Sequence, residues 1–250
     1  MSYSNYHTHT IYCDGKDPPE ELVLKAIELG CPELGFSGHS YTSYDESYCM
    51  SKNNTAKYLD EIKMLKAEHA DKIKIYTGIE YDYFSEESTD AFDYVIGAVH
   101  AVLKNGEYLA VDLSLDDLTK SIDKHYGGDA LAFAEDYFTL VGNLYEKTRC
   151  NVIAHFDLLT KFNEIKPVFD TSCERYRKAA LSALYKLKDA PVAFEINTGA
   201  ISRGYRTTPY PEDFIIKEIK KLGKKIIINS DCHDKENLIC GFDKFSHLCE

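Results

Sequence analysis

Short β-like runs alternate with helical patterns along almost the whole chain, and this alternation limits the possible folds more than any other feature. Alternating strands and helices imply parallel strands joined by right-handed crossovers. The sequence therefore predicts an α/β fold, either an open doubly wound sheet or a closed barrel. Seven runs qualify: the opening segment at 5–15 and the runs at 33–39, 72–81, 94–100, 151–156, 191–198 and 224–231.

Helical patterns separate these runs. The first helix is expected to begin at Asp17-Pro18 and to end at Gly30, because proline suits the first helical position and glycine suits the position after the last. The last helix carries an apolar stripe and is expected to end at Gly223. Further helices are expected around residues 58–65, 115–148 and 171–189.

Polar residues stand at the carboxyl end of every predicted strand. Active sites of α/β barrels are assembled at that end from many strands, whereas an open sheet concentrates its site at one switch point. No glycine-rich dinucleotide or P-loop fingerprint follows any strand. We therefore expect a distorted seven-stranded (β/α)7 TIM-like barrel. The residues at the strand ends are Asp14, His39, Glu80, His100, His155, Glu195 with Asn197, and Asp231 with His233.

The first and last strands carry paired candidate ligands. His7 and His9 are two residues apart and would point to the same face of a strand, with Asp14 returning from the following loop. Asp231 and His233 repeat this spacing. Because the first and seventh strands are neighbours in a closed barrel, we expect the two pairs to lie side by side.

The whole set favours a metal centre. His100 or His155 alone would suit a hydrogen-bonded core histidine, and Glu80 or Asp231 alone would suit a cap or a salt bridge. Six of the nine histidines stand at strand ends together with three carboxylates, and burying so many polar groups without compensation costs several kcal/mol. Two to three divalent cations would remove this cost, since histidine and carboxylate are ligands of zinc, iron and manganese.

Composition narrows the class of protein. A chain of 250 residues with 44% hydrophobic content can form one core, so a single domain over 1–250 is expected. The chain lacks a long apolar run and a signal peptide, which predicts a soluble cytoplasmic protein with no membrane partner. The net charge of −12 disfavours long nucleic acids but allows a small phosphorylated substrate. The eight cysteines form no C-x-x-C pair and are expected to be reduced.

The segments YHTHT, GFSGHS, VIGAVH and NSDCHD resemble the motifs of the polymerase and histidinol phosphatase (PHP) family. GIEYD and IAHFDL lie between them, and EINTGAISRGY and GHSYTSYDESYCMS are similar to the histidinol-phosphatase branch. The resemblance implies a trinuclear metal site and hydrolysis of L-histidinol phosphate to L-histidinol and phosphate, in histidine biosynthesis. It implies one metal on His7, His9, Glu80 and Asp231, a second on Asp14, His39 and His233, and a third on Glu80, His100 and His155.

Hydrolysis of a phosphate ester by bound metals also requires residues that bind the substrate. Two metals about 3.5–4 Å apart make hydroxide available to attack phosphorus and neutralise the phosphoryl oxygens. Arg203 and Arg206, in the loop after the sixth strand, are expected to bind phosphate in catalysis, and Lys161 is a further candidate. Glu195 is expected either to receive the substrate ammonium or to hydrogen-bond loop amides.

Three alternatives stay open at this point. The first is a phosphoesterase for another small phosphate ester or a short oligonucleotide. The second is a metal-dependent amidohydrolase, whose barrels also open with H-x-H but do not require His39 and His233. The third is a metal-binding scaffold without turnover. The oligomeric state cannot be read from the sequence.

Overall fold

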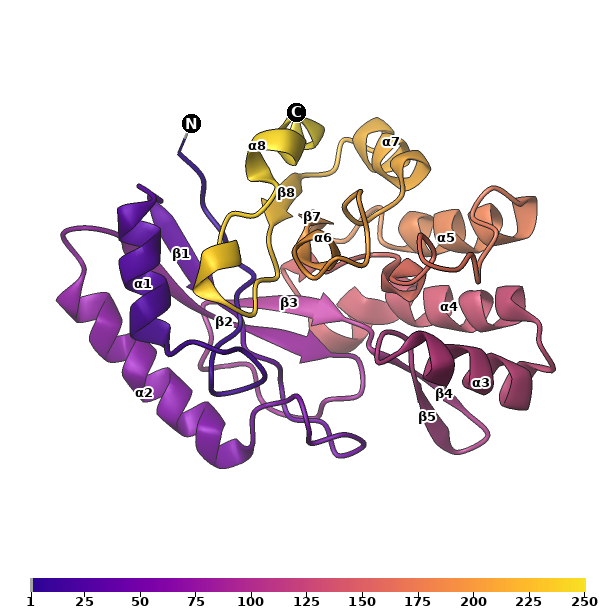
Figure 1. Ribbon diagram of the computed structural model, residues 1–250, viewed down its shortest axis with the longest axis horizontal. Coiled ribbons are helices and arrows are strands. Elements are labelled where there is room, and N and C mark those ends of the chain that lie inside the picture. Colours follow the sequence, from indigo (N-terminus) through magenta and orange to yellow (C-terminus); the bar gives the residue numbers. More distant parts are fainter. Residues whose placement is uncertain (1) are drawn as a thin grey trace.

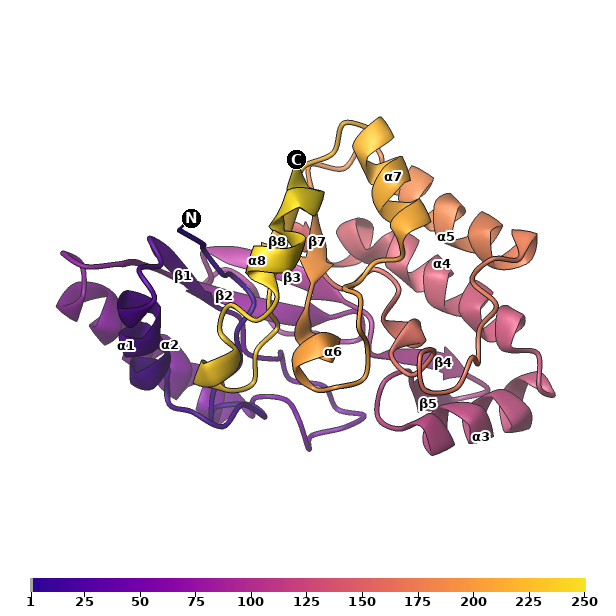
Figure 2. The same ribbon diagram turned by 45° about the horizontal axis from the view of Figure 1, so that its top comes forward.

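A curved sheet of six parallel strands forms the centre of the protein, as the computed structural model of residues 2–250 shows (Figure 1). The strand order is β1-β2-β3-β6-β7-β8. The sheet curls, so that β7 and β8 run across the direction of β2 and β3 (Figure 2). The strands are β1 (Glu33–Phe36), β2 (Lys74–Asp82), β3 (Tyr94–Ala98), β6 (Val152–Ile153), β7 (Ala193–Asn197) and β8 (Ile226–Asn229).

The opening segment occupies the expected place of a seventh strand without forming a regular one. Asn5 makes an isolated parallel bridge with Leu34 of β1, and Thr8 makes one with Cys232, beyond β8. Residues 5–9 therefore lie between the two edge strands of the curled sheet. Within the described chain the parallel sheet has six regular strands, so the α/β fold is confirmed and the expected seven-stranded barrel is not.

Side-chain oxygens explain this irregularity. The backbone N–H of Tyr6 donates to Oδ1 of Asn229 at 2.9 Å, and that of Thr8 donates to Oγ of Ser37 at 3.0 Å. These acceptors take the place of strand carbonyls, as short polar side chains commonly do. The segment is therefore held at both edges by side-chain acceptors together with a few backbone hydrogen bonds, rather than by a continuous ladder.

A hairpin that the sequence pattern did not indicate follows β3. Strands β4 (Ala101–Lys104) and β5 (Glu107–Ala110) pair antiparallel and stand apart from the main sheet. The expected helix over 115–148 is two helices, α3 (Leu115–Tyr126) and α4 (Ala130–Thr148). The break falls at Gly127 and Gly128, which both have positive φ and so suit a turn that ends a helix.

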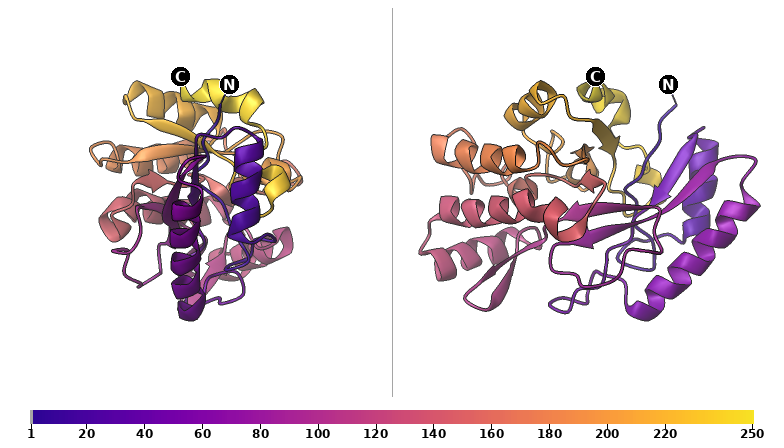
Figure 3. Two further views of the ribbon diagram at one scale, coloured as in Figure 1. Left: turned by 90° about the vertical axis from the view of Figure 1, so that its left-hand side faces the viewer. Right: turned by 180° about the vertical axis from the view of Figure 1, so that it is seen from behind.

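Helices cover the outside of the sheet. α1 and α2 pack against β1 and β2, while α3, α4 and α5 lie side by side at the other end (Figure 1). Both ends of the chain lie on the same side of the molecule (Figure 3). The remaining helical elements are α1 (Pro19–Glu28), α2 (Lys52–Glu68), α5 (Glu174–Lys186), α6 (Gly199–Ser202), α7 (Asp213–Lys221), α8 (Phe242–Phe245), η1 (Leu158–Thr160), η2 (Lys235–Asn237) and η3 (Ser246–Cys249).

One apolar cluster runs through most of the fold, from Leu22 in α1 to Leu238 near the C-terminus. A smaller cluster of Ile96, Ala98, Val152 and Ala154 packs on the β3–β6 part of the sheet. Between residues 2 and 250, no helix is both long and apolar enough to span a bilayer.

Candidate metal centre

Glu80, near the end of β2, lies at the centre of the histidines, and its side chain is 1% exposed. Its Oε2 is 3.2 Å from Nε2 of His7, 3.5 Å from Nε2 of His9 and 2.9 Å from Nδ1 of His39. His39 also forms an isolated parallel backbone bridge with Glu80. One carboxylate oxygen therefore faces three imidazoles from two different segments.

The other oxygen of Glu80 faces two more histidines. Oε1 is 3.3 Å from Nε2 of His100 and 2.9 Å from Nε2 of His155. His100 follows β3 and His155 follows β6, so the carboxyl ends of neighbouring strands bring these rings together. Glu80 is thus placed to bridge two groups of ligands.

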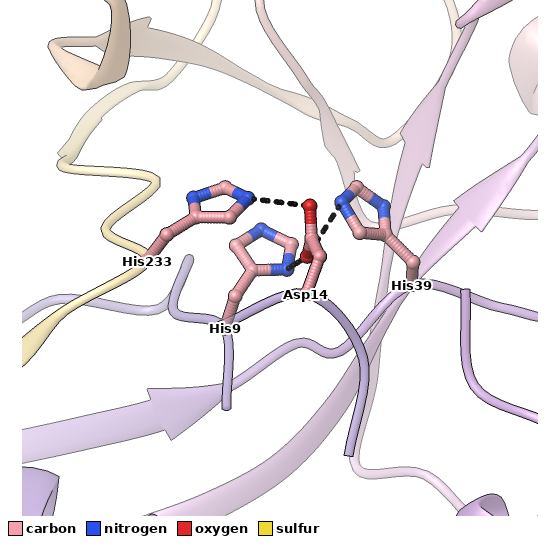
Figure 4. Close-up of side chains that lie close together, drawn as sticks. All are labelled: His9, Asp14, His39 and His233. Atoms are coloured by element: carbon pink, nitrogen blue, oxygen red, sulfur yellow. Dashed lines mark ion pairs between the residues drawn. The ribbon is translucent and has the colours of Figure 1, made fainter. Parts of the chain in front are cut away.

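A second group surrounds Asp14 (Figure 4). Its carboxylate is 3.2 Å from Nε2 of His233, 3.7 Å from Nε2 of His39 and 3.9 Å from Nδ1 of His9. The four side chains lie close enough to share one cation. His9 stands between this group and Glu80, because its two ring nitrogens face opposite ways.

Asp231 joins the two groups from beyond β8. Its Oδ1 is 3.1 Å from Nε2 of His9 and 3.7 Å from Nε2 of His7. Asp231 has φ of 48°, in the left-handed region that aspartate tolerates better than most residues. This bend, rather than strand pleating, sets the relative positions of Asp231 and His233.

The donor set fits divalent cations. Four buried atoms at the centre lack a hydrogen-bond partner among the described residues: Nε2 of His7, Nε2 of His9, Nδ1 of His39 and Oε2 of Glu80. Leaving a buried polar atom unpaired costs roughly 1–3 kcal/mol. Imidazole nitrogens and carboxylate oxygens that converge in this way are ligands for zinc and similar metals.

The electrostatics favour the metal-binding forms of Glu80 and His9. Burial raises the pKa of Glu80, but neighbouring His7, His39 and His100 outweigh burial and hold this pKa well below its ordinary value. Burial, together with His233 and His39, lowers the pKa of His9 to about 3. A charged carboxylate and a neutral imidazole are the forms that coordinate a cation.

A pocket of about 270 Å³ opens onto this cluster. Lys161 and Arg203 contribute cationic groups to its wall, and the ring of Tyr48 lies 4.9 Å from that of His39. A larger groove along α4 and α5 contains none of the histidines. The other residues that line the pocket are Asp14, Tyr44, Asp45, Ser47, Glu80, His100, Ala110, Asp112, Leu113, His155, Leu158, Asp231 and His233.

Arg206 does not reach this pocket. Its side chain is buried, where Nη1 donates to the carbonyl oxygen of Thr160 at 3.0 Å and Nη2 donates to Oε1 of Glu212 at 3.1 Å. The structure thus separates Arg206 from Arg203, although both come from one loop. Of the two arginines expected to bind phosphate, only Arg203 lines the pocket.

Glu195 lies behind the histidines rather than in the pocket. It is 1% exposed, and its Oε1 lies 2.8 Å from Nδ1 of His7. Its Oε2 accepts a hydrogen bond from the backbone N–H of His155 at 3.0 Å. Glu195 is not among the residues that line the pocket, and its contacts include hydrogen bonds from a backbone N–H and from a side-chain amide.

Two acidic residues of the site were missed in the sequence. Asp82 lies 3.1 Å from Nδ1 of His100, and the i, i+2 spacing of Glu80 and Asp82 on one strand was a usable signal. Asp112 accepts a hydrogen bond from Nζ of Lys161. Nothing in the pattern indicated Asp112, because it follows the unexpected hairpin.

Comparison with known proteins identifies the family. The PHP domain matches residues 5–199. The chain belongs to the PHP family. This PHP protein is 24% identical to the histidinol-phosphatase of Bacillus subtilis, with 100% of each chain covered.

Solved structures share the fold of this PHP protein. It matches a crystal structure of HisK from Listeria monocytogenes with a TM-score of 0.85 at 22% identity, covering 97% of this chain and 99% of the other. It matches histidinol phosphate phosphatase from Lactococcus lactis, complexed with zinc, L-histidinol and phosphate, with a TM-score of 0.74 at 20% identity. That match covers 99% of this chain and 92% of the other. The expected family is therefore confirmed.

Proposed function

We propose that this PHP protein is a metal-dependent histidinol-phosphate phosphatase, which hydrolyses L-histidinol phosphate to L-histidinol and phosphate. The observation that carries the proposal is the convergence of six histidines and three carboxylates beneath a pocket that also holds Arg203 and Lys161. The name of the Bacillus subtilis relative and the ligands of the Lactococcus lactis complex support this substrate.

Two to three divalent cations, of zinc, iron or manganese, belong to the proposal. Bound at this cluster, they would activate water at neutral pH and neutralise the charge on the phosphoryl oxygens. Their ligands would be His7, His9, Glu80 and Asp231 for one position, Asp14, His39 and His233 for a second, and Glu80, His100 and His155 for a third.

Arg203 and Lys161 would bind the phosphate. Arg203 is beside the cluster, and its buried Nε has no hydrogen-bond partner among the described residues. A guanidinium can donate to two phosphate oxygens at once, which fixes the orientation of the ester. The Lys161 ammonium would add a point charge on the pocket wall.

Arg206 and Glu195 take other roles in this proposal. Arg206 ties the loop after β7 to Thr160 and to Glu212, and so supports the loop from which Arg203 projects. Glu195 contacts His7 directly and would act on a ligand rather than on substrate.

A place in histidine biosynthesis, a cytoplasmic location and a single domain over 1–250 belong to the same proposal. Small phosphorylated substrates, rather than long nucleic acids, suit a pocket of about 270 Å³ on a chain with a net charge of −12.

The test of the substrate is the rate of phosphate release. Turnover of histidinol phosphate, of an aryl phosphate and of a nucleoside monophosphate would be compared on protein of measured metal content. We expect kcat/KM to be highest for histidinol phosphate. A clear preference for another ester would leave the hydrolytic centre in place and refute the assigned substrate.

The ligand assignment has its own test. His9→Ala should abolish phosphate release while the unfolding temperature of the metal-free chain changes little, because His9 faces the cluster with both ring nitrogens. Near-normal turnover of this variant with its metals restored would refute the assignment.

A further inference from the structure

Two buried carboxylates stand behind the histidines, on the side away from Glu80. We propose that Glu195 and Asp82 are positioning residues that fix the tautomers of His7 and His100. Each would hold the proton on Nδ1, so that Nε2 presents its lone pair to the metal centre. The proposal rests on the metal binding assumed in the proposed function, and it concerns residues that touch neither substrate nor metal.

The two histidines are held in the same way. Nδ1 of His7 is 2.8 Å from Oε1 of Glu195, while its Nε2 is 3.2 Å from Oε2 of Glu80. Nδ1 of His100 is 3.1 Å from Oδ2 of Asp82, while its Nε2 is 3.3 Å from Oε1 of Glu80. Each ring thus lies between an outer carboxylate and the bridging carboxylate.

The surroundings of Glu195 leave it no role other than acceptor. Besides His7, it accepts hydrogen bonds from the backbone N–H of His155 at 3.0 Å, from Nδ2 of Asn197 at 2.8 Å and from Nδ2 of Asn229 at 2.9 Å. Three donors other than His7 surround its two oxygens, which matches an ionised carboxylate that can only accept. The proton between Glu195 and His7 therefore belongs to Nδ1.

Backbone hydrogen bonds set the orientation of the Asn197 and Asn229 side-chain amides independently of Glu195. Oδ1 of Asn197 accepts a hydrogen bond from the backbone N–H of Gly199, and Oδ1 of Asn229 accepts one from that of Tyr6, each at 2.9 Å. A backbone N–H can only donate, so each amide must turn its NH2 group toward Glu195. The acceptor state of Glu195 does not depend on how these amides are assigned.

Asp82 is fixed by backbone groups as well. Its Oδ1 accepts from the N–H of Phe84 at 2.8 Å, and its Oδ2 accepts from the N–H of His100 at 3.3 Å. With 2% exposure it is as enclosed as Glu195. The carboxylate therefore stands beside the His100 ring as an acceptor for Nδ1.

A neutral imidazole carries one proton, so the partner of one nitrogen decides the state of the other. With the proton on Nδ1, the lone pair on Nε2 faces Glu80 and is free to bind a cation. With the proton on Nε2, the same ring would turn an N–H toward the cation. Outer hydrogen-bond partners of this kind change metal affinity about 10- to 100-fold when they are removed.

The experiment compares Glu195→Gln and Asp82→Asn with the wild-type chain. In Glu195→Gln the new NH2 group must face a donor, and of the surrounding donors only His7 can move its proton to the other ring nitrogen. We expect His7 alone to lose its Nδ1–H signature in long-range ¹H–¹⁵N spectra of the Zn²⁺-loaded chain. In Asp82→Asn we expect the change at His100 alone. Titration with buffered Zn²⁺ should show about 10- to 100-fold weaker binding at one position in each variant.

Asp157→Asn is the matched control. Asp157 is a fully buried carboxylate at the same end of the sheet, but its Oδ2 accepts from the N–H of Glu212 and it contacts none of these rings. This variant should lose stability while it keeps both tautomers and the affinity for Zn²⁺. The comparison thereby separates a general loss of stability from a specific change in the His7 and His100 tautomers.

Three results would overturn the proposal. One is a wild-type spectrum in which His7 or His100 carries its proton on Nε2. Another is Glu195→Gln with an unchanged His7 tautomer and unchanged Zn²⁺ affinity, which would make Glu195 a structural residue. The third is an equal effect of Asp157→Asn on both readouts. Failure of the proposed function differs from these, since wild-type protein would then bind Zn²⁺ but not hydrolyse histidinol phosphate.

Discussion

Arg203 lies against Asp231: its Nη1 donates to the backbone carbonyl of Asp231 at 3.1 Å, and its Nη2 is 3.2 Å from Oδ2 of the same residue. Nη1 is also 2.9 Å from Nδ1 of His233. The guanidinium proposed to bind phosphate is therefore held by two of the proposed metal ligands. This arrangement couples the position of the phosphate to that of the metals.

Arg203→Ala should raise the KM for phosphate esters about 10- to 100-fold, because a hydrogen bond to a charged group contributes roughly 1.5–3 kcal/mol. Bound metal, measured by elemental analysis, should change less. The KM of Arg203→Lys should lie between those of the wild-type chain and Arg203→Ala, because lysine keeps the positive charge but lacks the planar guanidinium. Loss of metal with an unchanged KM would instead show that Arg203 serves only to hold Asp231 and His233.

Gly199, at the start of α6, packs against the same pair. A Cβ at this position would lie 2.8 Å from Oδ2 of Asp231 and 2.9 Å from Nη2 of Arg203, which is too close for either to stay in place. We expect Gly199→Ala to lower kcat/KM about 10- to 100-fold without removing any functional group, because small misplacements in a site are costly. Steady-state kinetics of the purified variant would measure this.

Gly142→Ala is the control for that substitution. Gly142 lies in α4, and a Cβ there would meet Ala183 of α5 at 3.1 Å, away from the histidines. Its kcat/KM should match that of the unmodified chain even where its unfolding temperature shifts. If Gly199→Ala also had the kcat/KM of the unmodified chain, the predicted steric clash with Asp231 and Arg203 would be refuted.

Arg206→Met should destabilise the fold and leave KM unchanged. The substitution removes the donors to Thr160 and Glu212 from a buried place, for which we expect a loss of about 2–3 kcal/mol in the free energy of unfolding, since Glu212 remains partly exposed to solvent. Urea unfolding and KM on the same preparation would test both parts. A raised KM with normal stability would restore Arg206 to the substrate site.

Lys161 offers a comparison between two contacts. Its Nζ donates to the carbonyl oxygen of Asp112 at 2.7 Å and to the carboxylate of Asp112 at 3.1 Å. Lys161→Met should raise KM about 10-fold by removing one charged contact to phosphate. Asp112→Asn should have a smaller effect, because the backbone carbonyl still holds the ammonium. The reverse order would assign substrate recognition to Asp112.

The convergence of the histidines could be predicted because it follows from regular geometry. Strands of a parallel sheet end at one edge, and His100, His155 and Glu80 stand at or beyond three neighbouring strand ends. The spacing of His7 and His9 correctly predicted that both rings face the same cluster, although the segment is not a regular strand. An extended backbone held between β1 and the chain beyond β8 is enough to point both rings to the same side.

The features that the sequence did not predict lie in loops and in a hairpin, where no periodic hydrophobic pattern indicates the direction of a side chain. Arg203 and Arg206 are three residues apart, yet Gly204 between them has φ of 75° and turns the chain, so that only Arg203 reaches the pocket. The β4–β5 hairpin escaped notice because its strands are partly exposed and follow β3 without a helix between them. Its absence from the prediction also concealed Asp112, which stands just beyond it.

Return of metal to the metal-free chain tests whether the histidine cluster is a catalytic metal centre. Zn²⁺ or Mn²⁺ would be added in measured steps, and bound metal and phosphate release from histidinol phosphate would be followed in parallel. We expect no turnover without metal and full turnover once two to three ions are bound per chain. Full turnover by the metal-free chain, or saturation of the histidine cluster with no hydrolysis of histidinol phosphate, would refute the proposed function.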